Sequence, residues 1–147
     1  MAEKMDPRLI IITLDRAHEA AAVLAEAFMD YPVIRFFFAD QGELYRKRVI
    51  DLYNLSVRGV LAQHWTVMGI EYHGNLVAAA CLKGLAVIPE TGEIREEESR
   101  FFREIGPQAA SRIKRYNDVQ ENHRYQEPHY YLEDIGVLEA CRGMGFA

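Results

Sequence analysis

The fold is decided by residues 127–147, which read EPHYYLEDIGVLEACRGMGFA. Residues 129–137 are aromatic and β-branched, and this composition predicts a strand because such side chains pack well on a pleated surface. After a short loop at 138–141, residues 142–147 are interpreted as a glycine-containing turn that opens a helix. Such a junction leaves backbone N–H groups pointing outward, and the helix dipole adds positive charge there. This arrangement would bind phosphate or pyrophosphate.

The region before this stretch predicts helices preceded by a hairpin. Residues 93–103 and 107–122 have helical patterns separated by a Gly-Pro pair, and the simplest interpretation of the charge run in the first is a solvated face. Residues 65–72 and 76–82 have strand patterns, and His73-Gly74-Asn75 between them supplies residues that tolerate the positive φ of a turn. We expect the two strands to pair antiparallel.

The N-terminal region predicts a strand followed by two helices. Residues 9–14 are apolar and β-branched, and Asp15 is a candidate N-cap for a helix that continues to Phe28. Tyr31-Pro32 breaks that helix, and a second helical pattern covers residues 44–61. The order of strands and helices predicts one α/β domain over residues 1–147.

Composition narrows the class of protein. The 147 residues are half hydrophobic, which is enough for one packed core, and the net charge of -5 gives no basic excess for binding nucleic acid. The longest apolar run, residues 76–82, is far too short to cross a membrane, and no signal peptide is recognisable. Cys81 and Cys141 lie far apart, so neither a disulfide framework nor a metal site is indicated, and we expect a cytoplasmic protein.

Residues 142–147 fit a pattern of the GNAT superfamily of N-acetyltransferases: Gln or Arg, two free positions, Gly, one free position, then Gly or Ala. Residues 127–137 resemble the family's fourth strand as it appears in one group of bacterial and fungal members, where a helical insert like 93–122 precedes it. Residues 21–32 resemble the first helix and the loop that helps form the acceptor site. The resemblance implies a GNAT-like α/β fold, with a mixed, mostly antiparallel sheet flanked by helices.

The sequence departs from the family in two places. Leu138 and Glu139 stand where an acidic residue and a proline are common, which leaves the shape of that loop open. Family members also continue beyond the position of Ala147, with the rest of the pyrophosphate helix, a fifth strand, another helix and a tyrosine general acid. We therefore expect an N-terminal portion that is truncated within the cofactor motif, incomplete at its C-terminus and inactive alone.

The resemblance implies an enzyme that uses acetyl-CoA as co-substrate and acetylates a primary amine, of a small molecule or a protein, by direct attack in a ternary complex. Pantetheine would pair with the strand at Ile135 and Val137, and the Ile135 N–H would polarise the thioester carbonyl. Glu133, two residues before Ile135 and so on the same face, is the candidate base, while Asp134 is expected on the opposite face. An exposed strand carboxylate or an arginine partner is an equally weighted interpretation of Glu133. The implied cofactor-binding residues are Val137, Arg142, Gly143, Met144, Gly145, Phe146 and Ala147.

Several alternatives stay open at this point. His129, Tyr130 and Tyr131 either line the acceptor pocket or belong to the core, whereas His123 and His129 lack a third ligand for a metal site. The chain can instead be an inactive fragment that acts as a binding or dimerisation module, with the edge of its last strand pairing with a second copy. A different phosphate-binding α/β protein is a weaker interpretation, because dinucleotide folds usually place their glycine turn after the first strand.

Overall fold

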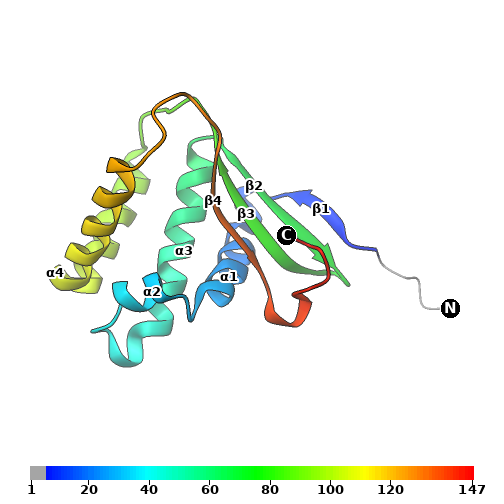
Figure 1. Cartoon of the computed structure of the whole chain (residues 1–147), viewed down its shortest axis with the longest axis horizontal. Coiled ribbons are helices and arrows are strands. Elements are labelled where there is room, and N and C mark those ends of the chain that lie inside the picture. The colour runs from blue at the N-terminus through cyan, green and yellow to red at the C-terminus, as the bar shows by residue number, and fades with distance from the viewer. Residues whose placement is uncertain (1–5) are drawn as a thin grey trace.

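The computed structural model describes residues 6–147 (Figure 1). Short 3-10 turns at Leu14–Arg16 and Gly42–Leu44 lie between main elements, and a third at Glu139–Cys141 follows the last strand. The predicted α/β class, a sheet flanked by helices, is confirmed. No helix in this part of the chain is both long and apolar enough to cross a membrane. In chain order the helices and strands are β1 (Arg8–Ile11), α1 (Ala17–Phe28), α2 (Pro32–Phe37), α3 (Tyr45–Ala62), β2 (Thr66–Tyr72), β3 (Asn75–Lys83), α4 (Gly92–Asn122) and β4 (Tyr131–Val137).

The sheet has the strand order β1-β2-β3-β4, and each neighbouring pair is antiparallel. Within residues 6–147 the sheet therefore has no parallel pair of the kind that a mixed sheet contains. His73 and Gly74 between β2 and β3 have φ of 50° and 78°. Positive φ at both central residues gives a turn whose twist matches that of the strands. The predicted hairpin is confirmed.

The start of α1 differs from the prediction. β1 ends at Ile11 rather than Leu14, and α1 begins at Ala17 after the 3-10 turn. The assignment of Asp15 as N-cap was wrong, because the Asp15 carboxylate lies inside that turn and accepts a hydrogen bond from the Thr13 hydroxyl. Sequence spacing alone does not distinguish a 3-10 turn from the first turn of an α-helix.

The predicted helix break at Tyr31-Pro32 does more than end α1. Tyr31 follows the end of α1 as predicted, but Pro32 opens the short helix α2 at its first position. At that position the missing N–H of proline costs no hydrogen bond, and its fixed φ suits the helix. The chain therefore turns sharply between α1 and α2, and Tyr31 stays half exposed at the corner.

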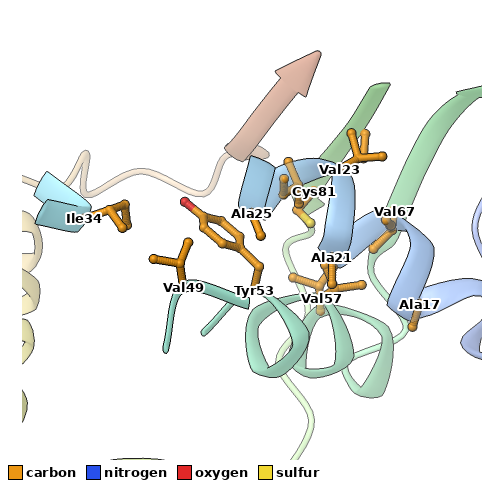
Figure 2. Close-up of a cluster of buried hydrophobic side chains, with 14 of the residues drawn as sticks. Ala17, Ala21, Val23, Ala25, Ile34, Val49, Tyr53, Val57, Val67 and Cys81 are labelled. Carbon is orange, nitrogen blue, oxygen red and sulfur yellow. The ribbon is translucent and has the colours of Figure 1, made fainter. Parts of the chain in front are cut away.

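Helices α1 and α3 cover one face of the sheet (Figure 1). The buried side of α1 consists largely of alanines, which lets the helix approach the strands closely. A Cβ at Gly136 of β4 would lie 2.7 Å from Ala27 Cβ and 3.3 Å from a methyl group of Leu24, so this glycine is needed for the close approach. Figure 2 shows the resulting core, with Tyr53 of α3 pointing its hydroxyl toward the side where Ile34 of α2 lies.

The other face of the sheet carries apolar side chains that no described helix covers. The register places Ile11, Met68, Ala80 and Ile135 in one row across the four strands. Ile11 is 63% exposed and Ile135 is 42% exposed. Exposed apolar groups in a contiguous row mark a surface that is normally in contact with something else.

Helix α4 is bent at Gly106-Pro107, where the sequence predicts a separation between two helices. Gly106 has φ 84° and ψ 169°, which interrupts the helical hydrogen bonds and leaves carbonyl groups without helical donors. The Gln41 side-chain amide donates to Ile105 O at 2.8 Å, and the buried Arg48 donates to Glu104 O at 3.0 Å. These contacts tie the end of the first half of α4, just before the bend, to the loop after α2 and to α3.

Candidate active site

The outer edge of β4 is unpaired within residues 6–147, and the register shows which backbone groups it presents. Leu138 N–H donates to Val77 O of β3 at 2.9 Å. Because donors alternate along an antiparallel strand, the N–H groups of Gly136 and Asp134 also face β3, and those of Ile135 and Val137 face outward. The two residues implied in pairing with pantetheine therefore lie on the open edge.

A β-bulge changes the positions of the two acidic residues of β4. Cys81 of β3 pairs with Asp134, but the next residue, Leu82, pairs with Leu132, so Glu133 is an extra residue in β4. The bulge breaks the alternation of side chains between the two faces. As a result Glu133 and Asp134 line the same pocket, and Ile135 does not. The expectation that Glu133 shares a face with Ile135 was wrong, whereas Asp134 does lie on the face opposite to Ile135.

This pocket, here named the aromatic pocket, has a volume of about 850 Å³. It lies where the end of α1, α2, α3, the second half of α4, the loop after α4 and the start of β4 meet. Its lining residues are Phe28, Tyr31, Val33, Ile34, Phe37, Leu52, Tyr53, Ser56, Lys83, Tyr116, Asn117, Gln120, Glu121, His123, Arg124, Tyr125, His129, Tyr131, Glu133 and Asp134.

The sequence alone did not indicate the helical residues of this pocket. Tyr53 and Ser56 are three positions apart on α3, and Tyr116 and Gln120 are four apart on α4, so each pair shares a helix face. Polar residues at helical spacing among apolar ones were the available signal. The signal does not show which helices meet, because that depends on tertiary packing.

Aromatic rings contact one another on two sides of the pocket. Phe28 stacks on Tyr53 with ring centroids 5.6 Å apart, and Tyr31 meets Phe28 edge-on, also at 5.6 Å. On the other side Phe37 meets Tyr116 edge-on at 5.2 Å. Pairs of this kind favour fixed ring orientations. The pocket therefore combines aromatic wall segments with the polar and charged side chains of its lining.

The two carboxylates of β4 differ in their electrostatic environment. Glu133 Oε1 lies 2.8 Å from Lys83 Nζ, so the partner of this carboxylate is a lysine rather than the arginine considered from the sequence. Burial raises the pKa of Asp134 to about 6, and the nearby Glu133 charge acts in the same direction, whereas Lys83 and the Ser56 hydroxyl oppose the increase. Near neutral pH Asp134 can therefore both release and accept a proton.

Two other titratable groups face Asp134 from the core. Burial raises the pKa of the Tyr53 hydroxyl, and burial raises the pKa of the Cys81 thiol to about 12. Both groups stay neutral at physiological pH. Cys81 is buried and Cys141 partly buried, and both are free thiols.

The aromatic and histidine residues near β4 are divided between the pocket and the surface. His129 and Tyr131 line the pocket, whereas Tyr130 is 68% exposed and does not. His123 and His129 each place Nδ1 within hydrogen-bonding distance of a backbone carbonyl, at 2.8 and 2.7 Å. Among residues 6–147 there is no group of three His, Cys, Asp or Glu side chains arranged to hold a metal ion.

The glycine-containing turn does not open a helix within residues 142–147. Gly143 and Gly145 have φ of 79° and 80°, which is incompatible with a right-handed helix, and the expectation of a helix start here was wrong. Space around both glycines is open. Arg142 donates to Val137 O at 3.3 Å and Ala27 O at 3.4 Å, so it ties the loop to β4 and α1.

The remaining residues of the implied cofactor motif follow the hydrogen-bonded Arg142 in the chain. Met144 is exposed, and Ala147 lies at the surface after it. Phe146 packs against Tyr72 of β2 at 5.4 Å, so the segment folds back toward the β2–β3 hairpin, as Figure 1 also shows.

Comparisons with known proteins give a likeness of fold. No family model and no curated protein matches the sequence. The chain is similar to a solved structure described as histone acetyltransferase HPA2 and related acetyltransferase from Corynebacterium glutamicum, with a TM-score of 0.63 and 15% identity. The match covers 97% of this chain and 66% of that one, so this chain spans about two thirds of the length of the protein it resembles. The likeness confirms the predicted GNAT-like fold.

Proposed function

We propose that the whole protein is an N-acetyltransferase that transfers the acetyl group of acetyl-CoA to a primary amine. The carrying observation is that β4 presents two features together: outward N–H groups at Ile135 and Val137, and the carboxylates of Glu133 and Asp134 in an adjoining pocket. The first feature suits an acyl donor and the second suits a cationic acceptor. The likeness of fold to an acetyltransferase supports the same reaction.

The open edge of β4 fits the donor. Acetyl-CoA, when bound, would supply the activated acetyl thioester. An extended amide-containing chain can add to an unpaired strand edge through backbone hydrogen bonds. The N–H of Val137 would hold such a chain, and the N–H of Ile135 would donate to the thioester oxygen as negative charge develops there. Gly143 and Gly145 leave open space for a diphosphate near the backbone that follows β4.

The aromatic pocket fits the acceptor. The amine enters as an ammonium ion, and a base must remove one proton before its nitrogen attacks the thioester carbon. Two observations support Asp134 over Glu133 as this base. Glu133 is occupied by Lys83, whereas burial raises the pKa of Asp134 to about 6, close to the working range of a general base.

The residues then act in sequence. Asp134 takes the proton, the amine nitrogen bonds to the acetyl carbon, the carbon–sulfur bond breaks, and the thiolate of coenzyme A leaves and is protonated. The second proton on nitrogen is lost as the amide forms and balances the proton that the thiolate gains, so the products are the amide and free coenzyme A. Asp134 is itself largely buried, and this strengthens its interaction with an ammonium group.

The proposal is tested on the complete polypeptide with acetyl-CoA. Binding to the folded state raises the melting temperature by mass action, and release of free coenzyme A thiol in the presence of an amine reports transfer. Absence of any thermal shift at millimolar acetyl-CoA would refute the proposal.

A matched pair of proline variants tests the role of the strand edge. Ile135→Pro removes an outward N–H that has no partner in the sheet, and proline is tolerated on the open side of an edge strand. This variant should keep its fold and lose transfer activity by roughly 10²–10³-fold, the loss typical for one oxyanion donor. Gly136→Pro removes an N–H that faces β3 and should destabilise the fold instead. Normal transfer by folded Ile135→Pro would exclude the polarising role.

A further inference from the structure

The charges of the aromatic pocket leave one carboxylate without a counter-ion. Glu133 is paired with Lys83 at 2.8 Å, and Glu121 is paired with Arg124 at 3.2 Å. Asp134 forms no ion pair with any residue in the range 6–147. The pocket therefore has two neutralised acid–base pairs and one carboxylate that is available to a cationic ligand.

The walls around that carboxylate are aromatic. Tyr53 and Phe28 form a stacked pair on the side of α1 and α3, and Tyr31 closes their edge. Tyr116 of α4 and Tyr131 of β4 also line the pocket. Flat apolar rings bury a carbon skeleton well, and their faces attract a cation that lies above them.

We propose that the acceptor is a monoamine, with one primary ammonium group that meets Asp134 and an apolar or aromatic body that packs among the rings of Phe28, Tyr31, Tyr116 and Tyr131. This inference rests on the proposed function and specifies its substrate class. A second ammonium group inside the pocket would lose its hydration with no unpaired carboxylate to compensate. Polyamines and lysine-rich peptides are therefore poor acceptors.

The test is calorimetric binding of two matched probes to the intact chain at pH 7.5. 2-Phenylethylamine carries one ammonium group on an aromatic body, and 1,4-diaminobutane carries two on an aliphatic one. We expect 2-phenylethylamine to bind at least about 10-fold more tightly, which corresponds to one favourable charge-assisted contact together with ring packing. Equal or tighter binding of diaminobutane, or of a lysine-rich peptide, would overturn the inference, as would the absence of amine binding.

Three variants test which side chains of the pocket recognise the amine. Asp134→Asn should weaken binding of 2-phenylethylamine by at least about 10-fold, because the amide keeps the shape and loses the charge. Lys83→Met frees Glu133 and should raise the affinity for diaminobutane by about 10-fold, since a second carboxylate then becomes available. Tyr131 is 40% exposed, so Tyr131→Ala should fold normally. It should lower the affinity for 2-phenylethylamine more than the affinity for diaminobutane.

The outcomes separate this inference from the proposed function. Binding of 2-phenylethylamine through Asp134, without acetyl transfer, would keep the monoamine site and refute the acetyltransferase. Acetyl transfer that prefers diaminobutane would keep the acetyltransferase and refute the monoamine assignment. Unchanged preference in Lys83→Met would show that charge pairing in the pocket does not select the ligand, and this would also overturn the inference.

Discussion

Replacement of Asp134 by Asn should stabilise the fold and abolish acetyl transfer, a combination that general damage to the protein does not produce. Burial raises the pKa of Asp134 from its ordinary 3.8 to about 6. The folded state thus binds this proton more tightly than the unfolded state. The stability that Asp134 contributes is complete below about pH 4 and is lost as the pH rises through about 6. The difference between 6 and 3.8, at about 1.4 kcal/mol per pKa unit, sets an upper limit of ~3 kcal/mol.

The assay is urea unfolding of both proteins at several pH values between 5 and 7.5, followed by circular dichroism. The gain from Asp134→Asn should be about half of its limit at pH 5 and approach the full limit of about 3 kcal/mol at pH 7.5. Other carboxylates do not obscure this window. Hydrogen bonds lower the pKa of Asp40 and of Glu71 below their ordinary values, so the stability they contribute is lost only at lower pH.

Glu133→Gln is the matched control for this experiment. It removes the neighbouring carboxylate and breaks the ion pair with Lys83. The Lys83 side chain is 28% exposed and the Glu133 side chain 27% exposed. We expect a loss of about 1 kcal/mol or less, with some transfer activity retained. An Asp134→Asn protein that is less stable than the parent at pH 7.5 would refute the argument from burial. Full transfer activity in that variant would refute the assignment of Asp134 as base.

The remaining predictions concern packing, the bend in α4 and association. Gly136→Ala should cost roughly 1–3 kcal/mol in thermal or urea unfolding, because its Cβ would lie 2.7 Å from Ala27 Cβ; an unchanged midpoint would show that α1 moves freely. Arg48→Met should cost about 2–4 kcal/mol, since Glu104 O loses its donor, while the exposed Lys47→Met should cost no more than ~0.5 kcal/mol; similar losses would contradict the role of Arg48. Light scattering of residues 1–147 should show dimers or larger species, because the β4 edge and the apolar row of the sheet are exposed, and a strict monomer would exclude the dimerisation hypothesis.

Most of the sheet was predictable because its signals are local. Alternating apolar residues and the His-Gly-Asn turn between β2 and β3 specify a hairpin within about twenty residues, and the structure contains it. The helix boundaries were less accurate, as Asp15 illustrates. A capping residue and a residue inside a 3-10 turn have the same local sequence pattern, and the choice between them depends on how the next helix packs.

The acceptor pocket was only partly predictable. Its acidic and aromatic residues on β4 were visible in the sequence, and the loop after α1 was expected near the site. Tyr53 and Tyr116 were not found, because they reach the pocket only through the packing of α3 and α4 around β4. The Gly-Pro bend in α4 was visible, but its direction depends on contacts from Gln41 and Arg48, which lie more than fifty residues away in the chain.

The bulge at Glu133 is the feature that the local sequence indicates least, and it determines where the two carboxylates of β4 lie. In a regular ladder one of two adjacent acidic residues would face the helices and the other the opposite side of the sheet. With the extra residue, both carboxylates line one pocket, while Ile135 and Val137 still present their N–H groups at the open edge. The proximity of Glu133 then contributes to the raised pKa of Asp134, and Lys83 forms an ion pair with Glu133 but none with Asp134. One inserted residue in β4 thus accounts for the separation of roles between a paired carboxylate and an available one, which neither composition nor spacing along the chain specifies.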